Sequence, residues 1–539
     1  MKELRETLCL TLSYSVTISF IQNSLIFLKL TSFYQYKFLD SVLLWILCNT
    51  DSPVRLQRFH RTNQSVLKFI MKKKKENTIF ENVLVEDFAS DAKCISRIDD
   101  KVIFIEGPVA PGDTVDLRVM KSKKSFMEAV AFNIRPESKY RTEVTCQHFG
   151  TCGGCKWQHI DYQVQLDFKT RQVTDALQRI AKVKLPEIKP IFPSADMFYY
   201  RNKLEYTFSQ NRWLTKEQMD SGEEFSRNAL GFHIPRRFDK ILAIEKCYLQ
   251  PDPSNAIRLE LRDFTEKHNL DYYEQIKQEK GALRNLIIRT ANTGDLMVIV
   301  QFAYCQPEDI DLVMNHLALK FPEITSLNYI INTKGNDTFF DLEVVNVKGL
   351  PYIVEEMEGL LFRVGPKSFF QTNSKQAFEL YKITREYADL QGDELVYDLY
   401  TGTGTIANFV ARQAKKVIGL EYVEMAVEDA KVNSQINNIS NTAFYAGDMR
   451  KLLSYDFVSQ HGRPDTVITD PPRAGMDEPV VRVLLEAAPK RIVYVSCNPA
   501  TQARDLAILD EKYAVTAVQP VDMFPQTHHV ENVVRLDLR

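Results

Sequence analysis

The C-terminal part of the chain alternates short apolar runs with stretches of helical periodicity. Strands are predicted at 394–400, 416–421, 465–470 and 491–497. This alternation is typical of a doubly wound, mainly parallel sheet, and therefore of an α/β fold. Two more apolar runs, at 514–521 and 531–538, are separated by only nine residues. Because a helical crossover needs a longer connection, we expect the sheet to end in an antiparallel pair.

The preceding sequence has a different pattern. Short apolar runs separated by turn residues at its start predict a small β-barrel. Helical and strand patterns are then mixed, and a helix-like stretch covers 163–183. The runs 285–289 and 295–301 flank Asn-Thr-Gly and predict a β-hairpin. The predicted domains are a barrel (78–136), a central mixed α+β domain (140–350) and an α/β domain (351–539).

The first 70 residues stand apart from this pattern. Leu8–Leu28 carries no formal charge and is long enough for a marginal membrane span, although Gln22 and Asn23 weaken that interpretation. Met71 opens a lysine-rich stretch, after which globular patterning begins. We hypothesise that Met71 is the true start and that 1–70 is translated upstream sequence. Peptides from 1–70 in the native protein, detected by mass spectrometry, would contradict this.

Length and composition narrow the class of protein. The chain has 539 residues, of which 45% are hydrophobic and 26% charged, and this suggests two to four globular domains. A formal net charge of −2 gives no global sign of a nucleic-acid partner, so a basic face would have to be local. Arg118–Arg141 holds seven Lys or Arg against two Glu, but a solvated surface explains this stretch equally well. Nine unevenly spaced cysteines favour a reducing, cytoplasmic setting over a disulfide scaffold.

Polar motifs follow four of the predicted strands. In an open α/β sheet, ligands bind beyond the carboxyl ends of the strands. Strand 394–400 runs into Thr401-Gly-Thr-Gly404, whose glycines allow a tight turn and a close approach of backbone to ligand. Strand 416–421 ends in Glu421, where an acid would accept hydrogen bonds from ribose hydroxyls. This loop and acid fit dinucleotides and S-adenosylmethionine alike.

The other two motifs have plain structural explanations when each is taken alone. Asp470-Pro-Pro fixes a rigid exit from its strand and could be a simple turn. Cys497 ends an apolar strand, where a cysteine more often packs in the core than reacts. Four consecutive strand ends of this kind nevertheless favour one ligand site at this edge of the sheet, with Cys497 as a member.

Five motifs extend this evidence. They are Gln371-Thr-Asn373, Asp398-Leu-Tyr-Thr-Gly-Thr-Gly404, Asp470-Pro-Pro-Arg-Ala-Gly475, Ser496-Cys-Asn-Pro-Ala-Thr501 and Phe524-Pro-Gln-Thr-His-His-Val-Glu531. Through them, residues 78–539 resemble the RNA uracil-5-methyltransferase family, and most closely its iron–sulfur branch that modifies 23S ribosomal RNA. Thr401 stands where the family usually has Cys. The resemblance implies a class I, Rossmann-like S-adenosylmethionine methyltransferase domain and an OB-like barrel of the TRAM type.

The chemistry of that family explains why these residue types are needed. C5 of uracil is a poor nucleophile, but a thiolate that adds to C6 gives an enolate whose C5 can attack a sulfonium methyl group. A base must then remove the C5 proton so that the thiol can leave. By resemblance, Cys497 is the nucleophile and Glu531 is the base. His528 and His529 are alternative bases, although adjacent His in a loop are more often surface groups.

The resemblance also implies how the cofactor is held. It places Gln371, Tyr400, Glu421 and Asp470 around S-adenosylmethionine. Glu421 would accept from the ribose hydroxyls and Tyr400 would line the pocket, while the other two would contact the amino-acid end and the reacting centre. Asp448 lies where an adenine contact is often found.

Three cysteines are clustered, at Cys146, Cys152 and Cys155, and Cys247 lies far downstream. Four such thiols could bind zinc or an iron–sulfur cluster, and the ligand chemistry alone leans towards zinc. The resemblance instead implies a 4Fe–4S cluster with a structural role.

The accessory domains indicate RNA as the substrate. Tyr199–Lys203 and Arg284–Arg289 offer aromatic and basic side chains where the family meets RNA. The branch implies 23S ribosomal RNA, and the T-loop uracil of tRNA is the alternative. A non-catalytic RNA-binding or assembly factor is opposed by the intact Cys497 and Glu531, and an N-methyltransferase by Arg473, where such enzymes have an aromatic residue. We expect a monomer without stable membrane association.

Overall fold

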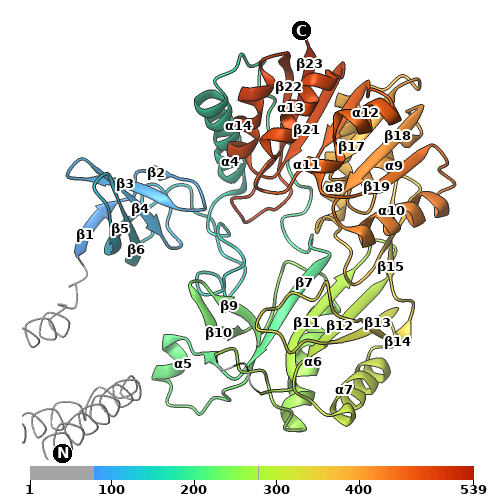
Figure 1. Cartoon of the computed structure of the whole chain (residues 1–539). Helices are drawn as coiled ribbons and strands as arrows, with labels where there is room; N and C mark the ends of the chain where they lie inside the picture. The colour runs from blue at the N-terminus through green and yellow to red at the C-terminus, as the bar shows by residue number, and fades with distance from the viewer. Residues whose placement is uncertain (1–77, 277, 279) are drawn as a thin grey trace, which may run out of the picture. The chain divides into compact units, whose positions relative to one another are not determined.

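The computed structural model describes residues 78–276, 278 and 280–539 (Figure 1). The extension proposed for 1–70, with its apolar stretch and Met71, lies outside these described residues. Among the helices of the described part, none is both long and apolar enough to cross a membrane. Within the described residues, three large sheets and one two-stranded sheet carry the fold.

The N-terminal part forms a six-stranded sheet, in agreement with the short apolar runs. Its strands are β1 (Ile79–Leu84), β2 (Asp87–Phe88), β3 (Cys94–Ile98), β4 (Lys101–Glu106), β5 (Thr114–Ser122) and β6 (Phe126–Arg135). They pair in the order β1-β5-β6-β4-β3-β2. Alternate positions of β5 are buried, so Val115, Leu117 and Val119 pack inside with Ile103 and Ile105 of β4. This two-residue period is that of a sheet with one apolar face.

The central part is built on an eight-stranded sheet. Its strands are β7 (Lys203–Ser209), β8 (Arg212–Trp213), β9 (Ala229–Ile234), β10 (Arg237–Ala243), β11 (Leu283–Thr290), β12 (Leu296–Phe302), β13 (Ser326–Ile331) and β14 (Val345–Gly349). The accompanying elements are α5 (Lys216–Asp220), α6 (Ser254–Lys267), α7 (Pro307–Lys320), β15 (Ile353–Met357) and β16 (Leu360–Val364). The predicted hairpin is confirmed, because β11 and β12 pair antiparallel with Ile287 opposite Ile299. Helices α6 and α7 bury apolar residues against this sheet.

The C-terminal part has the predicted α/β sheet. Its strands are β17 (Leu395–Leu399), β18 (Lys416–Glu421), β19 (Thr442–Ala446), β20 (Thr466–Thr469), β21 (Arg491–Ser496), β22 (Tyr513–Val521) and β23 (Glu531–Leu538). They pair in the order β19-β18-β17-β20-β21-β23-β22. The first five of this order are parallel, and β23 runs antiparallel to both of its neighbours. The antiparallel end predicted from the short connection is therefore confirmed.

Helices cover both faces of this sheet. They are α8 (Ser374–Ala388), α9 (Thr405–Ala411), α10 (Glu424–Ile436), α11 (Met449–Leu452), α12 (Tyr455–His461), α13 (Glu478–Ala487) and α14 (Pro499–Leu509). One apolar cluster joins α8, α9 and α10 to Val396 and Val417, and another joins α13 and α14 to Tyr397 and Ile418. Successive strand residues therefore face opposite layers, as a sheet buried on both sides requires.

Helix α4 (Tyr162–Ala176) corresponds to the helix-like stretch predicted before the central sheet. It begins at Asp161, whose carboxylate accepts from the backbone N–H groups of Gln163 and Val164, and it ends in a π-helical turn, Leu177–Ala181. Its apolar residues pack on α14 and the C-terminal sheet, and the two helices lie side by side in Figure 1. The chain thus places a helix on the C-terminal sheet before it forms the strands of the central sheet.

A buried ion pair ties α4 to the loop between β22 and β23. Lys169 Nζ lies 2.6 Å from Asp522 Oδ1, and both side chains are fully buried. Lys169 also donates to the carbonyl of Phe524 at 3.1 Å, and the Tyr162 hydroxyl donates to Asp522 Oδ2 at 2.8 Å. Since Glu531 follows this loop, the ion pair helps to fix the position of the segment that leads to this predicted catalytic residue.

Replacing Lys169 with methionine should destabilise the protein strongly. The Asp522 carboxylate would stay buried without its cation, and removing one partner of a buried pair costs about 3–5 kcal/mol. Urea unfolding followed by tryptophan fluorescence measures the loss. The matched control is Lys431→Met, which removes an exposed pair with Glu428 and should cost less than about 1 kcal/mol. Equal losses in both variants would contradict the stabilising role of the buried pair.

Candidate active site

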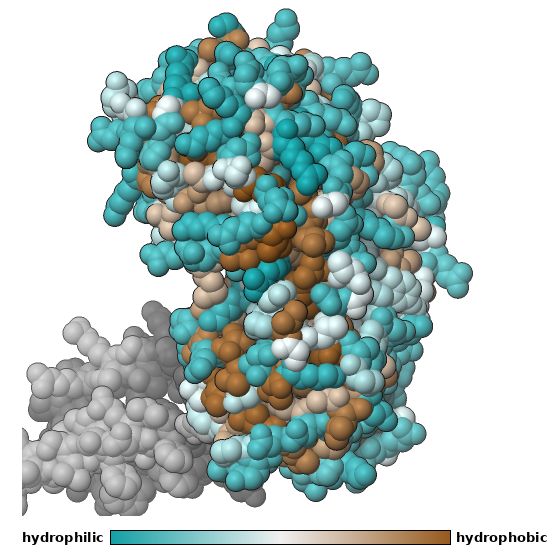
Figure 2. Space-filling view, turned by 90° about the vertical axis from the view of Figure 1, so that its right-hand side faces the viewer, coloured by the Kyte–Doolittle hydropathy of each residue, from teal (hydrophilic) through white to brown (hydrophobic). Residues whose placement is uncertain are grey.

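One large cavity lies beyond the carboxyl ends of the parallel strands of the C-terminal sheet. Its volume is about 1160 Å³. Six residues predicted for catalysis and cofactor binding line it: Gln371, Tyr400, Glu421, Asp470, Cys497 and Glu531. Figure 2 shows hydrophobic side chains gathered in the middle of one face of the molecule, with more hydrophilic surface around them. At the cavity itself, Phe369 and Tyr422 are 68% and 71% exposed, so apolar surface lies beside carboxyl groups and a thiol.

The glycine loop after β17 shapes one wall of this cavity. Tyr400, Gly402 and Gly404 have φ angles of 62°, 56° and 72°. A Cβ added to Gly404 would come within 2.8 Å of the Cβ of Ala430, so this position needs glycine. The loop therefore turns tightly at the strand end, where the backbone can approach a ligand.

Backbone N–H groups from two loops hold the Glu421 carboxylate. Its Oε2 accepts from Gly402 at 3.0 Å, and its Oε1 accepts from Tyr422 and Val423 at 2.8 and 2.9 Å. These three donors fill three of the roughly four acceptor sites of a carboxylate. The group is fixed at the cavity wall and keeps acceptor capacity for one hydroxyl.

Cys497 lies in the turn between β21 and α14, and this turn is joined to the Asp470-Pro-Pro loop. Asn498 Nδ2 and Thr501 Oγ1 each donate to the carbonyl of Arg473 at 3.1 Å. Burial raises the pKa of the Cys497 thiol to about 11, and the charges of Glu531 and Asp470 add to this effect. The free thiol is therefore protonated at neutral pH and needs help to ionise.

Two carboxyl groups line the cavity together with Cys497. Glu531 is the first residue of β23 and is 5% exposed. Burial and the nearby Asp470 carboxylate raise the pKa of Glu531 well above its usual value, while Arg473 opposes the shift. Burial raises the pKa of Asp470 to about 7. A carboxyl with the pKa of Asp470 can take up or release a proton near neutral pH, and the raised pKa of Glu531 makes its carboxylate a stronger base than an ordinary one, as general-base catalysis requires.

Arg473 also fixes the protonation of His529. Its Nη2 lies 2.8 Å from His529 Nδ1. A guanidinium can only donate, so Nδ1 accepts and the ring proton sits on Nε2. Burial lowers the pKa of His529 to about 3, with His528 and Arg473 contributing, so the ring is neutral. His529 then has a donor at one nitrogen and an occupied lone pair at the other.

The sequence and the fold of this chain are similar to those of known proteins. Residues 323–539 match the tRNA (uracil-5-)-methyltransferase family, and residues 77–132 match the TRAM domain. A protein of Bacteroides thetaiotaomicron named as an uncharacterized RNA methyltransferase is 58% identical over 455 residues, which are 84% of this chain and 100% of the relative. The chain belongs to the tRNA (uracil-5-)-methyltransferase family. A protein of the same name from Porphyromonas gingivalis is 54% identical over 84% of this chain and 98% of its own length.

The RNA methyltransferase is also similar to a solved structure. The crystal structure of Pyrococcus abyssi tRNA (uracil-54, C5)-methyltransferase in complex with S-adenosyl-L-homocysteine covers 85% of this chain and 100% of its own, with 28% identity and a TM-score of 0.65. The predicted fold class, a class I methyltransferase domain with an N-terminal TRAM domain, is confirmed.

Several residues that line the cavity of the methyltransferase were not predicted from the strand ends. Lys367 and Phe369 lie in the segment before α8, and Thr527 lies in the loop before β23. Arg201 lines this cavity as well as a second one that contains cysteines. The aromatic and basic character of Tyr199–Lys203 signalled Arg201, whereas no pattern in the sequence pointed to Lys367 or Phe369.

The interpretation of Arg284 and Arg289 as RNA contacts is wrong. These side chains are only 2% and 5% exposed. Arg284 donates to the carboxylate of Asp337, and Arg289 donates to the carbonyls of Gly365 and Ser368. Both guanidinium groups therefore hold loops of the methyltransferase in place.

Asp448, expected near the adenine, does not line the cavity. It precedes α11, where its carboxylate accepts from the backbone N–H of Arg450 at 3.1 Å and pairs with the Arg450 guanidinium at 2.7 Å. Its visible role is to cap this helix.

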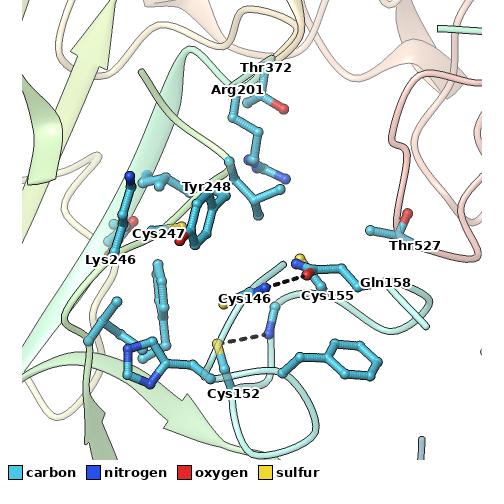
Figure 3. A pocket seen from close by; sticks show the side chains of 18 of the residues that line it. Cys146, Cys152, Cys155, Gln158, Arg201, Lys246, Cys247, Tyr248, Thr372 and Thr527 are labelled. Atoms are coloured by element: carbon cyan, nitrogen blue, oxygen red, sulfur yellow. Dashed lines mark hydrogen bonds between the residues drawn. The ribbon is translucent and has the colours of Figure 1, made fainter. Parts of the chain in front are cut away.

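The four cysteines predicted as metal ligands line a cavity of about 410 Å³ (Figure 3). Cys146, Cys152 and Cys155 come from one loop, and Cys247 comes from the segment after β10. Burial raises the pKa of Cys152 to about 11 and that of Cys155 to about 12. Among the described residues, no three His, Cys, Asp or Glu side chains are arranged to hold a metal ion, and no cysteine forms a disulfide.

Proposed function

We propose that this RNA methyltransferase transfers the methyl group of S-adenosylmethionine to C5 of a uracil in RNA, through a covalent adduct with Cys497. The observation that carries the proposal is that Cys497 and Glu531 line one cavity with the glycine loop and Glu421. A thiol, a buried carboxyl and a nucleoside-binding strand end are the three parts that this reaction needs.

Four residues would hold the cofactor. Glu421 has acceptor capacity left for the ribose, and Tyr400 lines the cavity at the tight turn. Gln371 and Asp470 would contact the amino-acid end and the reacting centre. The complex of the Pyrococcus abyssi relative with S-adenosyl-L-homocysteine supports this choice of cofactor. When bound, the cofactor supplies an electrophilic methyl group on a sulfonium.

The residues of the chain would carry the remaining chemistry in order. The Cys497 thiol gives up its proton, which Asp470 can accept near neutral pH, and the thiolate bonds to C6 of the uracil. In the resulting enolate, C5 carries the electron density that would accept the electrophilic methyl group of a bound cofactor. The Glu531 carboxylate then removes the C5 proton, the C6–S bond breaks, and the thiolate is restored.

Glu531 is a better candidate for the base than His529. Proton removal requires a free lone pair, and Arg473 occupies that of His529 Nδ1 while Nε2 carries the ring proton. The raised pKa of Glu531 gives its carboxylate the basicity that the step needs.

For the substrate we propose 23S ribosomal RNA. The proposal rests on the combination of a TRAM domain with four cysteines around one cavity. The T-loop uracil of tRNA is the second candidate, and the activity named for the Pyrococcus abyssi relative favours it.

Methylation of two transcripts by the purified protein distinguishes these substrates. With labelled S-adenosylmethionine, 23S RNA should take up label at least about tenfold faster than tRNA, a difference that corresponds to about 1.4 kcal/mol in the barrier. Mapping of 5-methyluridine in cells with and without the protein should identify the same RNA. Label confined to tRNA would overturn the ribosomal assignment and leave the chemistry intact.

We further propose that Cys146, Cys152, Cys155 and Cys247 hold a 4Fe–4S cluster. Clusters of this kind are bound in proteins by four cysteine thiolates. The support for a bound group is that the four thiols, three from one loop and Cys247 from another segment, line one cavity of about 410 Å³. Four thiolates of this kind also suit zinc, so iron and zinc must be distinguished by metal analysis.

The cluster should appear in protein purified without oxygen. We expect a brown solution with about four iron atoms per chain. Cys247→Ser should lose this iron, and Cys305→Ser, which changes a cysteine outside the cavity, should keep it. A colourless protein with one zinc per chain would show that the site binds zinc instead.

A further inference from the structure

A third cavity, distinct from the cysteine-lined one, also reaches Cys497. Its volume is about 830 Å³, and it is lined by residues around β2 and β3, by one side of α4 and by the loops that carry Cys497. Three residues, Arg473, Cys497 and His529, line both this cavity and the large one. Glu421, Tyr400 and the other residues proposed for the cofactor line the large cavity alone. The thiol therefore stands where two separate cavities meet.

This cavity, which we call the α4 groove, is lined by arginines that are already paired with carboxylates. Arg171 Nη2 lies 2.7 Å from Asp87 Oδ1, and Arg179 Nη2 lies 3.1 Å from Asp175 Oδ1. In both pairs the side chains are well exposed to solvent. Such pairs stabilise a protein little, so another anion can displace the carboxylate.

Arg171 is in addition held in position by an aromatic ring. Its guanidinium lies over the ring of Phe168, 5.0 Å from the centroid. Phe168 is buried, so the arginine is oriented before any ligand arrives. A pre-oriented guanidinium with a weakly held carboxylate suits the recognition of phosphate.

We propose that the α4 groove holds the RNA strand beside the target nucleotide, with Arg171 and Arg179 binding its phosphates in competition with Asp87 and Asp175. The inference rests on the proposed function only for placing the reacting uracil at Cys497. A base that reacts at this thiol must leave its stack, so the neighbouring nucleotides lie next to the site. With the cofactor in the large cavity, the α4 groove is a further cavity that leads to the thiol.

Competition between a carboxylate and a phosphate predicts opposite effects at paired residues. Asp87→Asn frees Arg171 and should strengthen RNA binding about three- to tenfold at low salt. Arg171→Glu should weaken binding at least about tenfold and lower the salt dependence of log Kd by about one. Arg179→Glu should act in the same direction. Because the Arg179 side chain is 76% exposed, this variant leaves the packing of the protein intact.

Fluorescence anisotropy measures these changes with a fluorescein-labelled single-stranded RNA of twenty nucleotides containing one central uridine. All variants are made in the Cys497→Ala protein, so that covalent chemistry does not contribute. The matched controls are Glu478→Gln and Arg482→Glu, which alter an exposed arginine–carboxylate pair on α13 outside the α4 groove.

Each outcome of this experiment decides the proposal. Opposite shifts for Asp87→Asn and Arg171→Glu, with flat controls, support it. Shifts no larger than those of the controls, or weaker binding in both variants, overturn it, because the pair would then be irrelevant to RNA or purely structural. The proposed function is tested separately by covalent trapping in protein with Cys497 intact, so either proposal can fail alone.

Discussion

Replacing Cys497 with alanine should abolish both methyl transfer and covalent trapping of RNA that contains 5-fluorouracil. Without the thiolate, C6 of the ring receives no nucleophile and C5 never gains the electron density to attack a methyl group. Loss of a covalent nucleophile lowers enzyme rates by roughly 10⁴-fold or more. With fluorine at C5 there is no proton for a base to remove, so the normal protein should remain bonded to the RNA. A denaturing gel shows this as a slowly migrating band.

The matched control for this prediction is Cys305→Ala. Cys305 is a free thiol outside both cavities that reach Cys497, so trapping should be unchanged in this variant. A band that persists in Cys497→Ala, or an adduct peptide that maps to another cysteine, would refute the assignment of the nucleophile. The same experiment separates the alternative functions, because a non-catalytic RNA-binding factor or an N-methyltransferase leaves no cysteine adduct.

Strand positions in the C-terminal domain could be predicted because their environment is uniform. Parallel strands covered on both faces are apolar throughout, so runs such as 491–497 stand out from the helices between them. The antiparallel pair β22 and β23 followed from the length of one connection. The strand-end rule likewise pointed to the edge of the sheet where Cys497 and Glu421 line one cavity.

Long-range packing could not be predicted in the same way. The pattern of α4 indicates that one face is buried, but not that this face meets the C-terminal sheet. Lys169 reads as an exposed helix residue, yet it is fully buried because Asp522, which is 353 positions away, neutralises it. Arg284 and Arg289 look like RNA contacts until the acceptors around them are known. In each case the partner that decides the role lies far along the chain.

The protonation of the site also depends on residues that are far apart in the sequence. No local pattern shows that Arg473 donates to His529, or that Asp470 and Glu531 are buried near one another. Only their placement supports the proposal that the carboxyl, rather than the imidazole, is the base.

Replacing Glu531 with glutamine should trap the enzyme on ordinary RNA. The first steps need only the thiolate and the methyl donor, so the adduct should form, but its C5 proton would have no base to accept it. Removing a general base lowers turnover by about 10²- to 10⁴-fold. The expected result is a methylated, protein-linked RNA that survives a denaturing gel and forms only when S-adenosylmethionine is present.

Folding should not confound this result. A buried carboxylate is costly, as the raised pKa of Glu531 indicates, so a neutral glutamine of similar shape should leave the fold at least as stable. The matched control is His529→Asn, in which the amide oxygen can still accept from Arg473 but the imidazole is gone. This control should accumulate no adduct on ordinary RNA. An adduct in this control, or a normal rate of turnover in Glu531→Gln, would show that Glu531 is not the base. Another group near Cys497 would then accept the C5 proton.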